Sequence, residues 1–255
     1  MSKAAFVPAL GALLLCLALK AAPAAAQVDF MVTFNANAAS AIGVAGTTAV
    51  NSAIQKSAEN AAGGSTGEAA STPSETKQPA SPASLSYQAS PQVAAEVEQA
   101  FVAGLSEAAP AQANEIERLF ERTDLVAEFD REMAPYSLRS GNLGDAFAAY
   151  WAAMWAVANA EPFPDEARIA AIRAQLARAL LANEQVAGAG DAARQRLAEA
   201  MIHEAAFALA AHDNAMNGRA PFTPQQLADH ADRNLRQKGM DFRAMTLTDD
   251  GFVPR

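Results

Sequence analysis

The chain has 255 residues, a formal net charge of −9 at neutral pH and one cysteine. Hydrophobic residues make up 51% of it, but 66 of them are alanine, so the strongly apolar residues suffice for one modest core. The acidic balance argues against a nucleic-acid-binding protein, which needs a basic face to displace counterions. Few runs of strand-forming residues occur, and alanine together with Leu, Glu, Arg and Gln favours helices.

The first 26 residues are typical of a secretory signal peptide. Lys3 supplies the positive start, residues 4–19 form an apolar run, and small residues stand at Ala24 and Ala26, so we expect cleavage before Gln27. A membrane anchor is the alternative, but the apolar run is short and is interrupted by proline and glycine. No other apolar run reaches about 18 residues, so we expect no transmembrane segment in the cleaved chain. The protein is therefore expected to be exported, to the periplasm or beyond.

Cys16 raises the alternative of a lipoprotein signal, in which the cysteine lies at the cleavage point. Leu15 precedes it and the apolar run continues beyond it, which argues against that alternative. Cleavage before Gln27 would remove the cysteine together with Lys3 and Lys20. The cleaved chain would then have no disulfide and no thiol, and its net charge would be −9 − 2 = −11.

Two segments separate the leader from the main domain. Residues 27–53 are expected to be weakly structured, with one short alternating strand signal from Val28 to Phe34. Residues 54–88 are rich in Ser, Ala and Pro and almost lack large apolar residues, which predicts a disordered linker. A glycosylated stalk or a cell-wall spacer is the alternative interpretation of this linker.

Apolar residues recur at helical spacing over residues 89–255, which predicts an all-α domain, a single bundle of about seven helices. Ser90 and Pro91 are typical of the start of the first helix. Thr223-Pro224-Gln225-Gln226 has the pattern of a capping box for the last one. The five helices between them are expected after Pro110, from Thr123 or Asp124, over 145–160, from about Pro164, and over 191–216. The tail, residues 240–253, predicts a short extended piece.

The helix over residues 145–160 is expected to lie at the centre of the bundle. Phe147, Trp151 and Trp155 are spaced four residues apart, and Asn159 continues the row. Eight alanines occupy other positions, which would let neighbouring helices approach closely. A helix that is apolar nearly all round is normally buried.

Three groups of residues resemble an uncharacterised family of secreted proteobacterial proteins with a helical domain of unknown function. They are Ser86-Tyr87 with Pro91; the run Asn142 to Trp151 with Met154, Trp155 and Asn159; and Gly239 to Arg243 with Leu247-Thr248 and Gly251-Phe252-Val253. The resemblance covers residues from about 85 to 254. It implies export and a helical domain behind a variable linker, and it implies neither an activity nor catalytic residues.

The best candidate for a binding site is the tryptophan-containing helix and its start. Its aromatic and polar side chains could form a pocket for a sugar or a peptide; they are Asn142, Asp145, Tyr150, Trp151, Trp155 and Asn159. The alternative is that the aromatic residues form the core and that the first two residues cap the helix.

No pattern in the sequence predicts a catalytic constellation, a metal site or a cofactor. His203-Glu204 begins like the zinc-protease motif, but Phe207 stands where the second histidine would be needed. We interpret Glu199 with His203, and the cluster from Asp229 to Asp232, as surface groups. The many acidic residues of 115–132 predict a solvated face, with an acidic patch for a basic partner or for cations as the alternative.

These observations leave the biochemical activity unknown. They favour an exported helical binding or structural module of the bacterial cell envelope over an enzyme, with an envelope protein or a small ligand as its partner. The alternative is a cell-envelope hydrolase with its site near Asp145, Tyr150 and Trp151. Such an enzyme would need a cleft in which at least two polar groups converge.

Overall fold

The structure is a computed structural model of the whole chain, and it describes residues 85–106 and 110–255. The expectations for the signal peptide, for residues 27–53 and for nearly all of the linker concern residues 1–84, which lie outside the described part.

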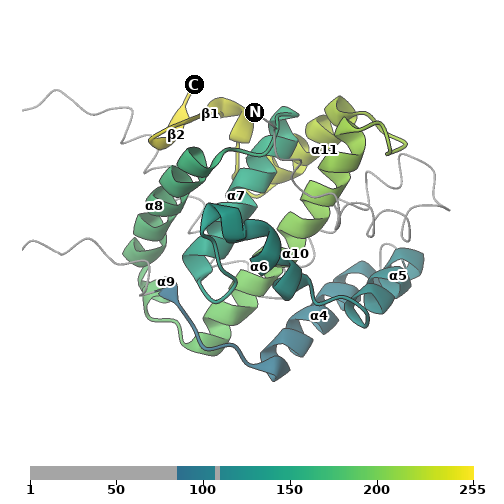
Figure 1. Cartoon of the computed structure of the whole chain (residues 1–255), viewed down its shortest axis with the longest axis vertical. Coiled ribbons are helices and arrows are strands. Elements are labelled where there is room, and N and C mark those ends of the chain that lie inside the picture. The colour runs from purple at the N-terminus through teal and green to yellow at the C-terminus, as the bar shows by residue number, and fades with distance from the viewer. Residues whose placement is uncertain (1–84, 107–109) are drawn as a thin grey trace, which may run out of the picture.

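The described residues form an all-α bundle with a small β-hairpin at its C-terminal end, which confirms the predicted fold class (Figure 1). The helices are α4 (Pro91–Ser106), α5 (Pro110–Phe120), α6 (Leu125–Met133), α7 (Leu143–Asn159), α8 (Glu166–Ala182), α9 (Glu184–Ala187), α10 (Asp191–Met216) and α11 (Pro224–Gln237), with short 3-10 turns η2 (Ala134–Tyr136) and η3 (Phe242–Ala244). Seven of these helices match the predicted ones. The four-residue α9 was not predicted.

Local capping chemistry sets where several helices begin. Asp124 and Asp165 each accept a hydrogen bond from a backbone N–H in the first turn of α6 and α8. The predicted capping box is present, since the Thr223 side chain and the Gln226 side chain each bind the backbone of the other. These contacts satisfy N–H groups that the helix itself leaves unpaired.

Helix α7 lies in the middle of the bundle, where α8, α10 and α11 all contact it. Fifteen of its seventeen residues are buried. Its alanines present little bulk, so the neighbouring backbones approach closely. Gly144 shows how tight this packing is: a Cβ atom there would lie 3.0 Å from the Leu85 Cδ1 atom.

The C-terminal segment closes one side of the core. Strands β1 (Met245–Thr248) and β2 (Gly251–Pro254) pair antiparallel, with Thr248 opposite Gly251, which confirms the predicted extended piece. The hairpin packs on α8, and Phe242 and Phe252 insert fully buried rings next to Trp151 on α7. The Trp151 and Phe242 rings meet edge to face at 5.0 Å, a favourable aromatic geometry.

The chain entering the bundle is packed from Leu85 onwards, four residues before the domain boundary predicted at residue 89. The Leu85 side chain is fully buried, and Ser86 forms a β-bridge with Asn142. The Tyr87 hydroxyl donates a hydrogen bond to the Ser140 carbonyl at 2.5 Å. Residues 85–88 therefore belong to the domain and not to the predicted linker.

Helices α4 and α5 form a pair at the edge of the bundle, at the lower right of Figure 1. Helix α4 packs on α10, and α5 packs mainly on α4. Within the described part of the chain, no helix is both long and apolar enough to cross a membrane.

Candidate functional site

The six candidate binding residues lie along the full length of α7 and do not meet at one point. Asn142 precedes the first residue of the helix and Asn159 is its last, a separation of about 25 Å at 1.5 Å per residue. Asn142 is the N-cap, because its side-chain oxygen accepts hydrogen bonds from the Gly144 and Asp145 backbone N–H groups. Its amide nitrogen donates to the Ser86 hydroxyl at 3.2 Å.

Asp145 is held by an arginine on the next helix. Its side chain is 2% exposed, and Arg173 donates to both carboxylate oxygens, at 2.5 and 3.1 Å. The Arg139 backbone N–H adds a third hydrogen bond. Burial raises the pKa of Asp145 even though Arg173 acts in the opposite direction. All these contacts are internal, so the carboxylate joins α7, α8 and the preceding loop.

Tyr150 lies in the core beside a second buried carboxyl group, Glu204 on α10. Burial raises the pKa of Glu204 to about 7, while Lys238 and the Tyr150 hydroxyl act to lower it. Burial also lowers the pKa of Lys238, and Glu204 opposes that shift. Neither carboxylate oxygen of Glu204 forms a well-aligned hydrogen bond within the described part of the chain. The three groups connect α7, α10 and the end of α11.

Trp151, Trp155 and Asn159 form the C-terminal half of the candidate row. Trp151 is fully buried against Phe242, and Trp155 is partly buried. The Asn159 amide donates to the Trp155 and Phe242 carbonyls, and its oxygen accepts from Arg255. These contacts tie the end of α7 to the C-terminal segment.

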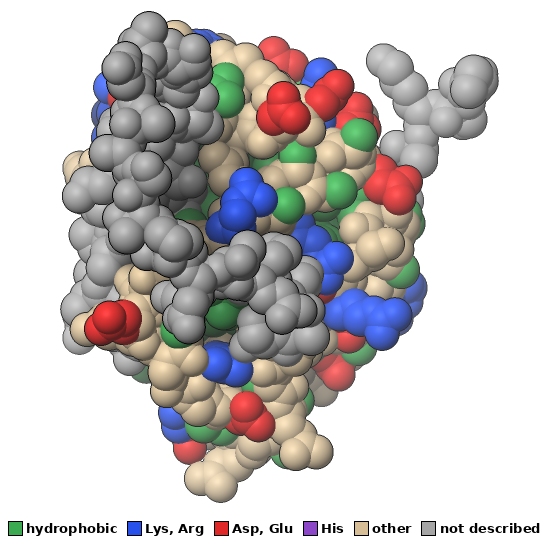
Figure 2. All heavy atoms as spheres, turned by 90° about the vertical axis from the view of Figure 1, so that its left-hand side faces the viewer, with side chains coloured by type: hydrophobic (Ala, Val, Ile, Leu, Met, Phe, Trp, Pro, Cys, Tyr) green, Lys and Arg blue, Asp and Glu red, His purple; other side chains and the backbone are tan. Residues whose placement is uncertain are grey.

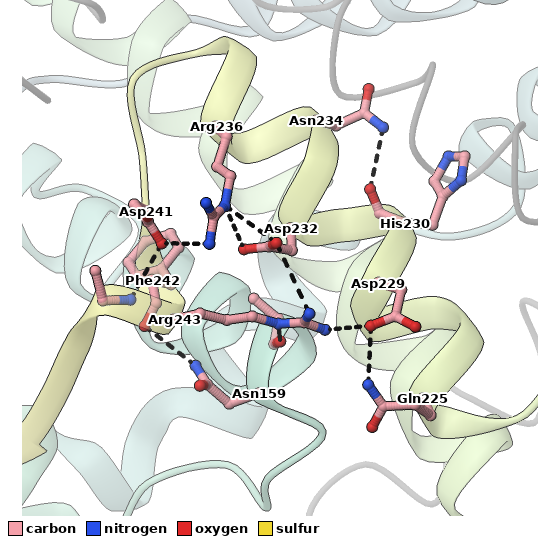
Figure 3. Close-up of polar contacts among 12 residues, drawn as sticks. Asn159, Gln225, Asp229, His230, Asp232, Asn234, Arg236, Asp241, Phe242 and Arg243 are labelled. Atoms are coloured by element: carbon pink, nitrogen blue, oxygen red, sulfur yellow. Dashed lines mark hydrogen bonds and ion pairs between the residues drawn. The ribbon is translucent and has the colours of Figure 1, made fainter. Parts of the chain in front are cut away.

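The surroundings of Asn159 are a network of ion pairs between α11 and the C-terminal segment (Figure 3). Arg243 donates to the Ala158 carbonyl at 2.8 Å and to Asp229 at 2.7 Å. Arg236 bonds both Asp232 and Asp241. The acidic residues of the 229–232 cluster are thus bound to arginines, and no group of three or more His, Cys, Asp or Glu side chains in the described residues has an arrangement that could hold a metal ion.

A groove of about 500 Å³ lies between α4 and α5, and none of the six candidates lines it. Its described lining residues are Glu98, Gln99, Val102, Ala103, Ser106, Glu117, Phe120 and Glu121. Three of these are acidic and none is basic. The apolar part includes the partly buried Phe120 ring. Burial raises the pKa of Glu98, and the nearby Asp124 adds to this effect.

Two polar side chains of α10 are buried behind the groove. His203 is 1% exposed and Glu199 is 3% exposed. The His203 ring packs against Phe120, with 5.0 Å between ring centroids, and against Phe101 at 5.4 Å. Three of their polar atoms have no hydrogen-bond partner within the described part of the chain: both ring nitrogens of His203 and the Oε2 atom of Glu199. Glu199 Oε1 accepts from Gln195 at 2.8 Å.

The charges around these two side chains are negative. Burial raises the pKa of Glu199, and Glu98 and Asp124 raise it further. Burial lowers the pKa of His203 to about 4, so the ring is neutral at neutral pH, although Asp124 acts in the opposite direction. Glu98 therefore belongs both to the groove and to the acidic surroundings of Glu199.

The interpretation of Glu199 and His203 as a surface pair is wrong, because the structure buries both. Helix α10 contacts α4, α6, α7 and α11, so almost no side of its middle faces solvent. The available signal was the alanine on every face of this helix, which indicates close neighbours all round. Polar residues in such a helix are expected to be buried, and buried polar groups need partners.

The α4–α5 groove, with the buried pair behind it, is the candidate site that the geometry supports.

A family model described as "Family of unknown function (DUF6683)" matches residues 6–255. No curated protein and no solved structure matches the chain.

Proposed function

The chain belongs to the family of unknown function DUF6683, and on the geometry of its groove we propose that it is an exported binding module of the bacterial cell envelope. Its ligand would be a cationic, partly apolar peptide segment bound between α4 and α5. The observation that carries this proposal is the composition of the groove, in which three carboxylates and an aromatic ring are not balanced by any basic lining residue.

The groove is complementary to lysine or arginine next to apolar side chains. Glu117 on α5 and Glu121, just beyond its last residue, are exposed at the groove and can pair with cations. The face of Phe120 can accept a cation or pack against an aliphatic side chain. Helix α4 itself contains neither Lys nor Arg. The face of the molecule in Figure 2 has basic side chains across its middle and acidic side chains nearer its edges.

Export is the second part of the proposal and rests on the sequence of residues 1–26. The test is to produce the full chain in a Gram-negative bacterium, to fractionate the cells and to determine the N-terminus by mass spectrometry. We expect the periplasmic or secreted fraction to contain a chain that begins at Gln27. A chain that keeps residues 1–26 and stays in the cytoplasm would contradict export without affecting the groove.

The binding test uses an acetylated and amidated octapeptide of alternating leucine and lysine, titrated into the full chain by isothermal titration calorimetry. We expect the double variant Glu117→Gln/Glu121→Gln to weaken binding about fivefold, since it removes two exposed ion pairs that contribute roughly 0.5 kcal/mol each. The matched control is Asp249→Asn/Asp250→Asn, which removes two exposed charges far from the groove in sequence and should change little. A peptide with glutamate in place of lysine should not bind. Failure of the lysine peptide to bind would refute the groove as a site for cations.

The alternative of a hydrolase near Asp145, Tyr150 and Trp151 has less support. The Asp145 carboxylate is engaged by Arg173 and Arg139, and Trp151 is fully buried. A catalytic acid needs access to a substrate, and these side chains contact other parts of the protein instead.

A further inference from the structure

The Phe120 ring lies between the groove and His203 of the buried pair on α10. Phe120 lines the groove, and its ring centroid is 5.0 Å from that of His203. Phe120 is the last residue of α5 and is only partly buried, so its side chain is less constrained than a core ring. Rotation of this ring would bring the groove into contact with His203.

His203 and Glu199 lie one helical turn apart on the same face of α10, because residues four apart on a helix are neighbours. Buried polar atoms without partners are costly and rare in folded proteins. Here three such atoms, the two His203 ring nitrogens and Glu199 Oε2, occur within one turn. This concentration points to a ligand that supplies the missing hydrogen bonds.

The chemistry of these atoms defines that ligand. Glu199 Oε2 is an acceptor, and a neutral imidazole offers one further acceptor nitrogen. Glu98 and Asp124 add negative potential at Glu199, and Asp124 acts on His203 as well. A positively charged group with several N–H donors satisfies all of these conditions. A primary ammonium group is compact and is carried on a flexible four-carbon stem in lysine, so it could pass the Phe120 ring more easily than a planar guanidinium.

We propose that the groove continues past Phe120 to a buried recognition point, formed by Glu199 and His203, that binds the ammonium group of a lysine side chain. This inference rests on the proposed function and names the feature of the ligand that is recognised. Glu199 accepts one N–H of the ammonium group through Oε2, and the neutral His203 ring accepts another. The groove carboxylates attract the ligand, while the buried pair distinguishes an ammonium group with N–H donors from other cations.

The experiment compares three forms of the leucine–lysine octapeptide in binding to the full chain. The first peptide contains unmodified lysine. The second contains trimethyllysine, which keeps the positive charge but has no N–H donor. The third contains acetyllysine, which is neutral. We expect the unmodified peptide to bind best and the trimethylated peptide to bind about tenfold to a hundredfold more weakly, the usual range for a hydrogen bond to a charged group. The acetylated peptide should show no binding.

The variant Glu199→Gln keeps the shape of the side chain and its contact with Gln195. We expect it to weaken binding of the unmodified peptide by the same factor and to leave the trimethylated peptide unchanged. Glu204→Gln is the matched control, because Glu204 is also a buried carboxyl group on α10 but lies beside Tyr150 and Lys238. It should bind all three peptides as the wild-type chain does.

Nitrogen-15 NMR of the histidine rings gives a readout in the unmodified chain, should Glu199→Gln fail to fold. We expect the unmodified peptide to shift the ring nitrogens of His203, assigned by elimination with His230→Gln and His212→Gln. Equal binding of the lysine and trimethyllysine peptides, without a His203 shift, would overturn the buried recognition point and leave the acidic groove as the site. Absence of binding by the lysine peptide would overturn both proposals.

Discussion

Asp145 on α7 and Arg173 on α8 form a bidentate ion pair between the two helices. The Arg173 Nε and Nη2 atoms lie 2.5 and 3.1 Å from the two carboxylate oxygens. The carboxylate is buried, whereas the arginine side chain is 30% exposed. Such bidentate contacts are directional and strong. The pair therefore fixes the start of α7 against α8, and the neighbouring Asn142 cap fixes it against the entering chain.

Replacing Arg173 should destabilise the fold more than replacing another arginine of α8. Arg173→Leu leaves the Asp145 carboxylate buried and unpaired, which typically costs about 3 kcal/mol of unfolding free energy. The loss should be smaller at pH 5 than at pH 8, because burial already raises the pKa of Asp145 and without Arg173 the carboxyl group can protonate. Urea unfolding at the two pH values measures both effects.

The control for this prediction is Arg178→Leu, which removes an exposed arginine from the same helix and should cost less than about 0.5 kcal/mol. The double variant Asp145→Asn/Arg173→Leu should regain part of the loss, since no uncompensated charge remains. Equal losses for the two single arginine variants would show that the pair contributes no more than a surface charge.

Because Glu204 is buried, we expect the stability of the fold to decrease as the pH rises from about 4.5 to about 7. Its pKa is raised by burial from 4.5 to about 7, so the folded chain binds this proton more tightly than the unfolded chain. Stability then falls as the pH rises between these two values, by up to about 1.4 kcal/mol per pH unit. Glu204→Gln removes the ionisable group and should flatten the dependence, as urea midpoints at pH 5, 6, 7 and 8 would show. The exposed Glu166→Gln should reproduce the wild-type slope; an unchanged slope in Glu204→Gln would contradict the assignment.

Local chemistry made the helix boundaries predictable from the sequence. The Thr223–Gln226 capping box needs only neighbouring residues, and the structure shows it. The Asn142 cap was one of two interpretations of that residue, and the structure shows it as well. The predicted fold class follows from the same helical periodicity, because apolar stripes must be buried against other helices.

Contacts between residues far apart in the chain could not be predicted from the sequence. Asp145 and Arg173 are 28 residues apart, and no local pattern connects them. Helix α10 has alanine on every side, so its sequence does not indicate which face is solvated, and Glu199 and His203 were assigned to the surface. The groove depends on how α4 and α5 pack against each other, which the spacing of apolar residues does not determine.

Because the His203 ring is buried, we expect the folded chain to lose stability when the pH is lowered. Burial lowers its pKa from 6.5 to about 4, so the unfolded chain binds this proton more tightly than the folded chain. Stability therefore falls as the pH decreases from about 6.5 towards 4. His203→Phe should be near neutral in stability at pH 7.5, because an apolar ring replaces unpaired polar atoms, and more stable than the wild-type chain by about 2 kcal/mol at pH 5. Thermal and urea unfolding at the two pH values test this, with His230→Gln as the control.

The variant His203→Phe also shows whether the effect of this residue on stability is independent of its effect on peptide binding. His203→Phe removes an acceptor of the proposed ammonium site while it completes an aromatic cluster with Phe101 and Phe120. We expect a chain that is stable at pH 5 yet binds the lysine peptide more weakly. A variant that is no more stable at pH 5 than the wild-type chain would show that His203 does not titrate as a buried group.

Gly251 should tolerate alanine much less well than Gly218, although both have positive φ angles, +107° and +66°. A Cβ atom at Gly251 would lie 2.6 Å from the Gln175 Oε1 atom, whereas nothing lies within 4 Å of one at Gly218. Gln175 holds the hairpin on α8, since Oε1 accepts from the Phe252 N–H at 2.8 Å and Nε2 donates to the Phe252 carbonyl at 3.0 Å. Gly251→Ala therefore displaces these buried hydrogen bonds in addition to straining the backbone, and we expect it to lower the free energy of unfolding by about 3 kcal/mol.

Gly218→Ala is the control, because it strains the backbone alone and should lower the free energy of unfolding by about 1 kcal/mol. Urea unfolding compares the two, and equal losses would mean that the Gln175 contact contributes nothing to holding the hairpin in place.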